Sequence, residues 1–127
     1  MVKGDKAFSG FSVNDLDAAK KFYGETLGLE IDGGSAQGLM LKAAGPNGIF
    51  IYSKEDHVPA TYTILNFRVT DIDKAVDELA GKGVKFESYE GVTDKKGIAR
   101  GKSIGQGPDI AWFKDPAGNF LSVLNED

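Results

Sequence analysis

The sequence contains the same short segment twice, and this repeat constrains the fold more than any other feature. Phe11–Ala19 reads Phe-Ser-Val-Asn-Asp-Leu-Asp-Ala-Ala, and Phe67–Ala75 reads Phe-Arg-Val-Thr-Asp-Ile-Asp-Lys-Ala. The second copy starts 56 residues after the first in a chain of 127 residues. Two such copies predict one supersecondary unit built twice, with the units closing on each other. We therefore expect the functional site in a cleft between them.

The first copy predicts the element order β-α-β-β-β. A strand over 6–13 leads into a helix that Asn14 or Asp15 can cap and that Gly28 ends. Short apolar runs separated by turn residues complete the copy. They predict strands over 29–31, 38–42 and 49–52, with turns at 32–35 and 46–48.

The second copy predicts the same order, with one long interruption. A strand over 63–69 precedes a helix over 71–82, and the later strands are predicted over 84–88, 110–113 and 120–124. The Asp-Pro-Ala-Gly-Asn sequence at 115–119 is typical of a turn in which Asp and Asn side chains bond nearby backbone. Residues 89–108 are rich in Gly, Lys and Arg, and exceed a usual connection. We interpret them as a solvated hairpin loop or a flap over the cleft.

Composition limits the classes of protein that fit. A hydrophobic content of 41% supports one α+β domain over 1–127, with units 6–53 and 63–124 joined by a linker at 54–62. The chain has no cysteine and no apolar run long enough to span a membrane. The N-terminus does not resemble a secretory signal, so we expect a cytoplasmic protein. A net charge of −4 argues against a nucleic-acid partner.

Strand alternation predicts which side chains line the cleft. Phe11 and Val13 should pack on the helix, which leaves Phe8 and Ser12 on the cleft side. The same argument in the second copy and on neighbouring strands completes the predicted ligand-binding set: Phe8, Ser12, Tyr52, Ile64, Asn66, Arg68, Trp112 and Ser122.

This mixed aromatic and polar wall is typical of a pocket for an apolar organic molecule with some polar or anionic groups. Arg68 would pair with an acidic residue, await an anionic ligand, or reach water from an edge strand. The competing interpretation is that Phe8, Ile64 and Ser122 only fill a collapsed core.

Three segments resemble the vicinal oxygen chelate superfamily, which contains glyoxalase I, bleomycin-resistance proteins, fosfomycin-resistance enzymes and extradiol dioxygenases. These segments are Val13–Leu29, Val69–Val84 and Ala111–Leu124. The resemblance implies two tandem βαβββ units that form a curved mixed sheet around a cleft. It covers nearly the whole chain, but it does not select one activity, because this fold hosts many chemistries.

The resemblance also implies where metal-dependent members place their ligands. These positions lie seven residues before each Asp of Val-x-Asp and seven after the Asp of Asp-Pro-x-Gly-Asn, so they fall on Phe8, Ile64 and Ser122. Phe, Ile and Ser are not the imidazole, amide or carboxylate ligands of the family. The single histidine, His57, lies in the predicted linker, where we expect a solvated surface residue. We therefore expect no intrinsic metal cofactor.

Three functions remain open from the sequence. The first, which the missing ligands favour, is a small-molecule binding protein of the bleomycin-resistance type, which by resemblance would be a homodimer. The second is a glyoxalase-like lyase or isomerase, or a dioxygenase, with a divalent metal. Glu87 and Glu90 are the candidates for a proton-abstracting base, although both fit solvated surface positions. The third is a non-catalytic module in regulation or assembly.

Overall fold

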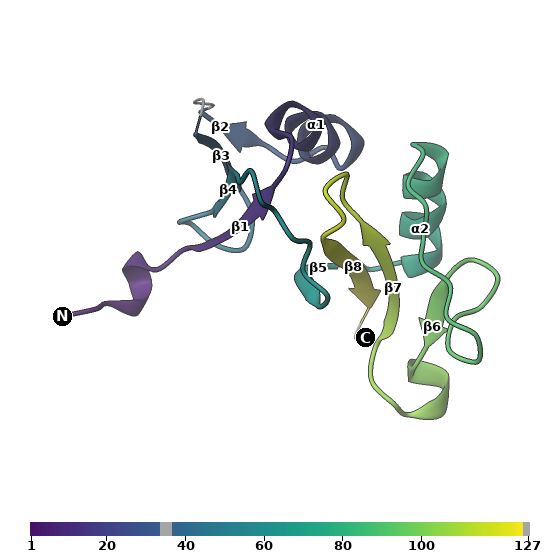
Figure 1. Ribbon diagram of the computed structural model, residues 1–127. Coiled ribbons are helices and arrows are strands. Elements are labelled where there is room, and N and C mark those ends of the chain that lie inside the picture. The colour runs from purple at the N-terminus through teal and green to yellow at the C-terminus, as the bar shows by residue number, and fades with distance from the viewer. Residues whose placement is uncertain (34–36, 126–127) are drawn as a thin grey trace. The chain divides into compact units, whose positions relative to one another are not determined.

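Each half of the chain forms one four-stranded sheet with a helix packed on it. The computed structural model describes residues 1–33 and 37–125, so the predicted turn at 32–35 lies partly outside the described residues. The chain divides into two compact units, Met1–Pro59 and Ala60–Asp127, called unit 1 and unit 2 below. Figure 1 labels the elements of both units along the chain.

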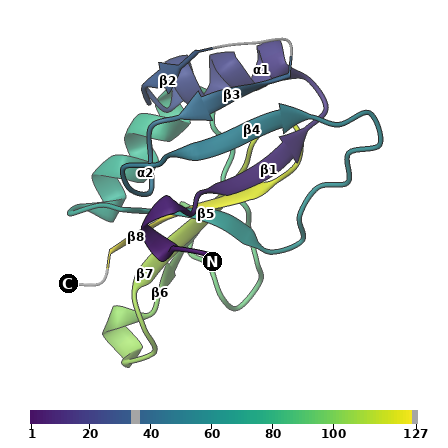
Figure 2. The ribbon, with the colours of Figure 1, turned by 90° about the vertical axis from the view of Figure 1, so that its left-hand side faces the viewer.

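Unit 1 has the strand order β1-β4-β3-β2. β1 pairs with β4 in parallel, whereas β4–β3 and β3–β2 are antiparallel. Figure 2 shows β1, β4 and β3 side by side. The elements are the 3₁₀ turn η1 (Gly4–Lys6), β1 (Ser9–Val13), α1 (Leu16–Lys21), the π-helical turn η2 (Phe22–Thr26), β2 (Ile31–Asp32), β3 (Gly38–Leu41) and β4 (Ile49–Ser53).

Unit 2 repeats this topology, with the strand order β5-β8-β7-β6. β5 pairs with β8 in parallel, and the other pairs are antiparallel. Its elements are β5 (Thr63–Arg68), α2 (Ile72–Gly81), β6 (Ile98–Arg100), the 3₁₀ turn η3 (Lys102–Ile104), β7 (Asp109–Lys114) and β8 (Phe120–Asn125). The predicted α+β class with two tandem βαβββ units is confirmed.

The repeated Val-x-Asp sequence sets the start of each helix. The Oδ1 atoms of Asp15 and Asp71 accept hydrogen bonds at 3.1 Å from the backbone N–H groups of Ala18 and Lys74, so both aspartates are N-caps. Val13, two residues before the first cap, is 1% exposed. The repeat therefore joins the end of a strand to a capped helix in each unit.

Each core lies between the helix and one face of its own sheet. In unit 1 α1 packs on β3 and β4, and the fully buried Tyr23 ring lies 5.8 Å from the Phe11 ring between centroids. In unit 2 α2 packs on β7 and β8, where Phe113 and Leu121 are fully buried. Burial of Val13 and Tyr23 confirms that Phe11 and Val13 face the helix.

The predicted strand over 84–88 is wrong. Phe86 forms one isolated bridge with Phe113, and the strand that completes the sheet is β6, which the sequence analysis had placed inside the 89–108 loop. Ile98 of β6 is fully buried and pairs with Ala111. The apolar alternation of Val84 and Phe86 reflects packing on the core without the backbone pairing of a strand.

Ion pairs fasten β6 to the start of α2. Arg100 donates from Nη1 and Nη2 to the two carboxylate oxygens of Asp73 at 2.9 and 2.8 Å, and from Nε to Asp94 at 3.0 Å. Lys96 Nζ lies 2.9 Å from Asp73 Oδ1 and 3.0 Å from Asp77 Oδ1. Hydrogen bonds from Arg100 and then Lys96 hold the pKa of Asp73 well below its usual range. A charged network therefore holds residues 94–100 against α2.

The predicted turn at 115–119 is confirmed, with its polar side chains buried. Asp115 Oδ1 accepts from the backbone N–H groups of Ala117 and Asn119, each at 2.9 Å. Asn119 donates to Asp115 Oδ2 at 3.1 Å and accepts from the N–H of Ala60 at 3.1 Å. Both side chains are thereby satisfied where water is excluded.

Across residues 1–33 and 37–125, no helix combines the length and apolar character that a membrane crossing requires.

The Asp73 network predicts a specific loss of stability in acid. Folding lowers the pKa of Asp73, so its carboxylate contributes to the free energy of unfolding at pH values above the ordinary pKa of 3.8. This contribution is lost as the pH falls below 3.8. We expect Asp73→Asn to flatten the decline in unfolding free energy between about pH 5 and pH 2.5, measured by urea denaturation. Asp17→Asn is the matched control, because Asp17 has the same place in α1. An equal flattening in both variants would contradict the prediction.

Candidate functional site

The sheet of unit 1 has one face that α1 does not cover, called open face 1 below. Leu39, Leu41 and Ile51 point toward the helix and are at most 4% exposed. Alternating residues, which pair in register across three strands, therefore point the other way. Open face 1 consists of Gly10 and Ser12 of β1, Gly38 and Met40 of β3, and Phe50 and Tyr52 of β4.

Two aromatic rings form a flat surface on open face 1. The Phe50 and Tyr52 rings are stacked, with centroids 5.8 Å apart and planes 20° from parallel, and both are half-buried. Each ring has one glycine among its in-register neighbours, Gly10 for Phe50 and Gly38 for Tyr52. A Cβ atom at Gly38 would lie 2.6 Å from the Phe50 ring, and one at Gly10 would lie 3.9 Å from the Tyr52 ring. The glycines leave room for the rings to lie along the sheet.

A polar pair borders this aromatic surface. Ser12 Oγ lies 2.6 Å from Nδ1 of His57, and Ser12 is the in-register partner of Tyr52. His57 is half-buried, so the expectation of a solvated linker histidine is wrong. No local sequence signal predicts this contact, because the two residues are 45 positions apart.

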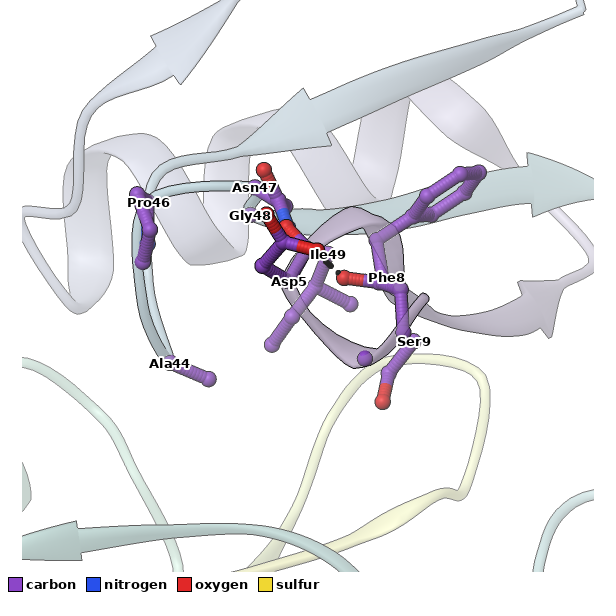
Figure 3. Close-up of a pocket in the computed structure, with 10 residues that line it drawn as sticks. Asp5, Phe8, Ser9, Ala44, Pro46, Asn47, Gly48 and Ile49 are labelled. Atoms are coloured by element: carbon purple, nitrogen blue, oxygen red, sulfur yellow. Dashed lines mark hydrogen bonds between the residues drawn. The ribbon is translucent and has the colours of Figure 1, made fainter. Parts of the chain in front are cut away.

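Phe8 lies outside β1 and is 60% exposed, so it does not complete the aromatic surface. It lines a hollow of about 390 Å³ between the N-terminal segment and the β3–β4 turn. Asn47 closes one side by donating to the backbone carbonyls of Asp5 at 2.7 Å and Ala7 at 2.9 Å. In Figure 3 the Phe8 ring points away from Pro46. Of the predicted ligand-binding residues, Phe8 alone lines this hollow.

The sheet of unit 2 presents the corresponding open face 2. Leu121 and Val123 point toward the core, and register pairing places the alternate residues on the other side. Open face 2 includes Asn66 and Arg68 of β5, Trp112 and Lys114 of β7, and Phe120 and Ser122 of β8.

The centre of open face 2 is a hydrogen-bonded row. Ser122 pairs in register with Asn66 on one side and Trp112 on the other. Its hydroxyl, which is fully buried, donates to Asn66 Oδ1 at 2.5 Å. Trp112 meets Tyr89 edge-on, with centroids 5.8 Å apart. The Ser122 hydroxyl hydrogen is therefore already used in the hydrogen bond to Asn66.

Cationic groups flank this row. Arg68 is exposed on β5, an edge strand. Lys114 Nζ lies 5.0 Å from the Phe120 ring centroid and 3.7 Å from Glu87 Oε1. Glu87 is thus paired with a lysine, and Glu90 is exposed.

The structure groups the predicted residues by unit. Ser12 and Tyr52 are neighbours on open face 1, while Asn66, Trp112 and Ser122 are neighbours on open face 2. Ile64 lies at a bulge between Thr63 and Leu65, where the alternation that grouped it with Asn66 is interrupted. Convergence of both groups on one cleft stays a prediction.

The residues at the family's metal positions do not fit a metal. Phe8 and Ile64 offer hydrocarbon, and the Ser122 hydroxyl is held by Asn66. Strand register adds a fourth position. In unit 2 Asn66 pairs with Ser122, and in unit 1 its repeat counterpart Gly10 pairs with Phe50. Phe50 therefore occupies the position in unit 1 that corresponds to Ser122 in unit 2. Across the described parts of the chain, no three His, Cys, Asp or Glu side chains gather as a metal site would require.

The family profile described as Glyoxalase/Bleomycin resistance protein/Dioxygenase superfamily matches residues 8–123. The chain belongs to this superfamily. The match spans both repeats and the turn at 115–119, so it includes both open faces. No curated protein matches the chain significantly.

Solved structures of the superfamily share this fold. A glyoxalase family protein from Enterococcus faecalis has a TM-score of 0.67 and 22% identity, covering 92% of this chain and 94% of its own. TnmS3, an antibiotic binding protein from Streptomyces sp. CB03234, has a TM-score of 0.66 and 21% identity, covering 99% and 100%. The fosfomycin resistance protein FosX from Listeria monocytogenes has a TM-score of 0.69 and 17% identity, covering 100% and 96%. At these identities the likeness shows the fold alone.

The aromatic surface of open face 1 predicts that Gly38 cannot be enlarged. A methyl group there would lie 2.6 Å from both the Phe50 ring and the Ile51 carbonyl oxygen. We expect Gly38→Ala to destabilise the fold by about 1–3 kcal/mol, measured by urea denaturation. Gly4→Ala is the control, since nothing lies within 4 Å of a Cβ atom at Gly4. Equal stability of the two variants would contradict the prediction.

Proposed function

We propose that this protein binds a small organic molecule with a planar aromatic part and does so without a catalytic metal of its own. The observation that carries the proposal is the stacked Phe50–Tyr52 pair on a sheet face that its own helix leaves uncovered. Phe50 also occupies a position that corresponds by register to a metal-ligand position of the family. An aromatic side chain thus stands where a chelating group would be needed.

Aromatic stacking supports recognition of a flat ligand. Offset stacking and ring-edge contacts add about 0.5–1.5 kcal/mol per pair beyond area burial. Gly10 and Gly38 place no Cβ atom against the two rings. The half-buried Met40, in register with Phe50, adds a polarizable side chain that tolerates ligands of different shape.

The superfamily neighbours support a role in small-molecule binding. TnmS3 is an antibiotic binding protein, and FosX is a fosfomycin resistance protein. Their printed functions differ, so neither names the ligand of this chain. A metal-dependent lyase, isomerase or dioxygenase is the alternative that the first experiment below decides. The proposed homodimer is tested separately by light scattering.

Metal binding is the first test. We expect metal-depleted protein titrated with Ni²⁺, Zn²⁺, Mn²⁺ or Fe²⁺ in a calorimeter to show no tight 1:1 complex, because the ligand positions hold Phe8, Phe50, Ile64 and Ser122. Elemental analysis of protein purified without chelators checks the same point. One tightly held metal per chain would contradict the proposal and favour the enzymatic alternative.

Binding of a flat aromatic probe is the second test. We expect the neutral dye N-phenyl-1-naphthylamine to bind with enhanced fluorescence, and Tyr52→Ala to weaken binding about tenfold by removing half of the stacked pair. Tyr62→Ala is the matched control, because Tyr62 is 71% exposed and lies outside open face 1. Equal affinity of the two variants for the dye would show that the dye binds outside open face 1.

A further inference from the structure

The turn between β3 and β4 holds the start of the chain through one side chain. Asn47 donates from Nδ2 to the backbone carbonyl oxygens of Asp5 at 2.7 Å and Ala7 at 2.9 Å (Figure 3). These acceptors belong to residues 1–7, called the N-terminal arm below, which precede β1. Two hydrogen bonds between the arm and the turn therefore depend on one amide nitrogen.

The residue after Asn47 makes this amide chemically labile. Asn47–Gly48 is the only Asn-Gly dipeptide in the sequence. Gly48 has no Cβ atom to obstruct the approach of its backbone nitrogen to the Cγ atom of Asn47. Asn47 is exposed to water, and the N–H group of Gly48 donates a long hydrogen bond of 3.3 Å to the carbonyl oxygen of Gly45. The chain and the solvent therefore supply every reactant that loss of the amide requires.

We infer that Asn47 is a site of spontaneous deamidation whose reaction releases the N-terminal arm from the β3–β4 turn. The backbone nitrogen of Gly48 attacks Asn47 Cγ, the Cγ–Nδ2 bond breaks, and Nδ2 leaves as ammonia with the proton of the attacking nitrogen. Water then opens the succinimide ring and leaves aspartate or isoaspartate at position 47. No oxidant or reductant is needed, because no atom changes its oxidation state. The inference is independent of the proposed function.

The product reverses the chemistry of the contact between the arm and the turn. An ionised carboxylate has no hydrogen to donate, so its oxygens would face the carbonyl oxygens of Asp5 and Ala7 and repel them. In isoaspartate the main chain also runs through the former side chain, which lengthens the turn. Gly4, Asp5 and Ala7 of the arm line the hollow of about 390 Å³ beside this turn. Release of the arm therefore opens that hollow.

Peptide mass spectrometry tests whether the reaction occurs. Trypsin cleaves after Lys42 and Lys54, and the peptide 43–54 contains Asn47 as its one asparagine and no glutamine. We expect this peptide to gain the mass difference between an amide and an acid while the folded protein is incubated in warm, mildly alkaline buffer. A sample digested before incubation is the control. The peptides that carry the other asparagines should not change, because a bulkier residue follows each of them.

Substitutions test whether the product releases the arm. We expect Asn47→Asp to raise the rate of trypsin cleavage after Lys6 about tenfold, because loss of two hydrogen bonds increases the population with an open arm. Asn47→Ala, which removes the donor without adding charge, should also raise this rate. Asn14→Asp is the matched control, because it adds the same charge at an exposed position of unit 1. Cleavage after Lys102 in unit 2 is the reference within each sample.

The two measurements support or overturn the inference together. A mass gain in the peptide 43–54 with faster cleavage after Lys6 in Asn47→Asp supports it. If the denatured chain reacts but the folded protein does not, the turn protects Asn47 and the inference is overturned. Equal cleavage after Lys6 in Asn47→Asp and Asn14→Asp also overturns it, because the arm would then stay in place without the amide.

Discussion

Parallel pairing of the first and last strand in each unit is the constraint on which the other features depend. β1 pairs with β4, and β5 pairs with β8, although a helix and two further strands separate the two partners along the chain. This pairing sets Gly10 beside Phe50, Ser12 beside Tyr52 and Asn66 beside Ser122. Both open faces follow from that register, because alternation then decides which side chains reach the core.

Much of this architecture is encoded locally and could be read from the sequence. The Asp15 and Asp71 caps and the Asp115–Asn119 turn each depend on residues within about five positions of one another. Strand alternation also predicted that Ser12 and Asn66 point away from the helix, as the register has them. Hydrogen bonds between residues close in the sequence can be predicted from the sequence alone.

The features that sequence reasoning missed depend on contacts between distant positions. β6 pairs because Ile98 is buried against Ala111 and Arg100 reaches Asp73, whereas the better-looking strand pattern at 84–88 makes one bridge. His57 belongs to the candidate site through a partner 45 residues away. The bulge at Ile64 interrupts a register that counting alone treats as continuous. Periodicity does not carry this information.

The network around Asp73 also shows how a duplicated unit can diverge in length without losing its fold. In unit 1, the helical segment ending at Thr26 is followed closely by β2 at Ile31, whereas β6 in unit 2 starts only at Ile98, well after α2 ends at Gly81. The carboxylates of Asp73 and Asp94 hold the end of this longer connection between α2 and β6 in place by binding Arg100. The exposed residues Glu90, Gly91 and Val92 precede this network, so new sequence can be grafted there while the return of the chain to the sheet stays fixed.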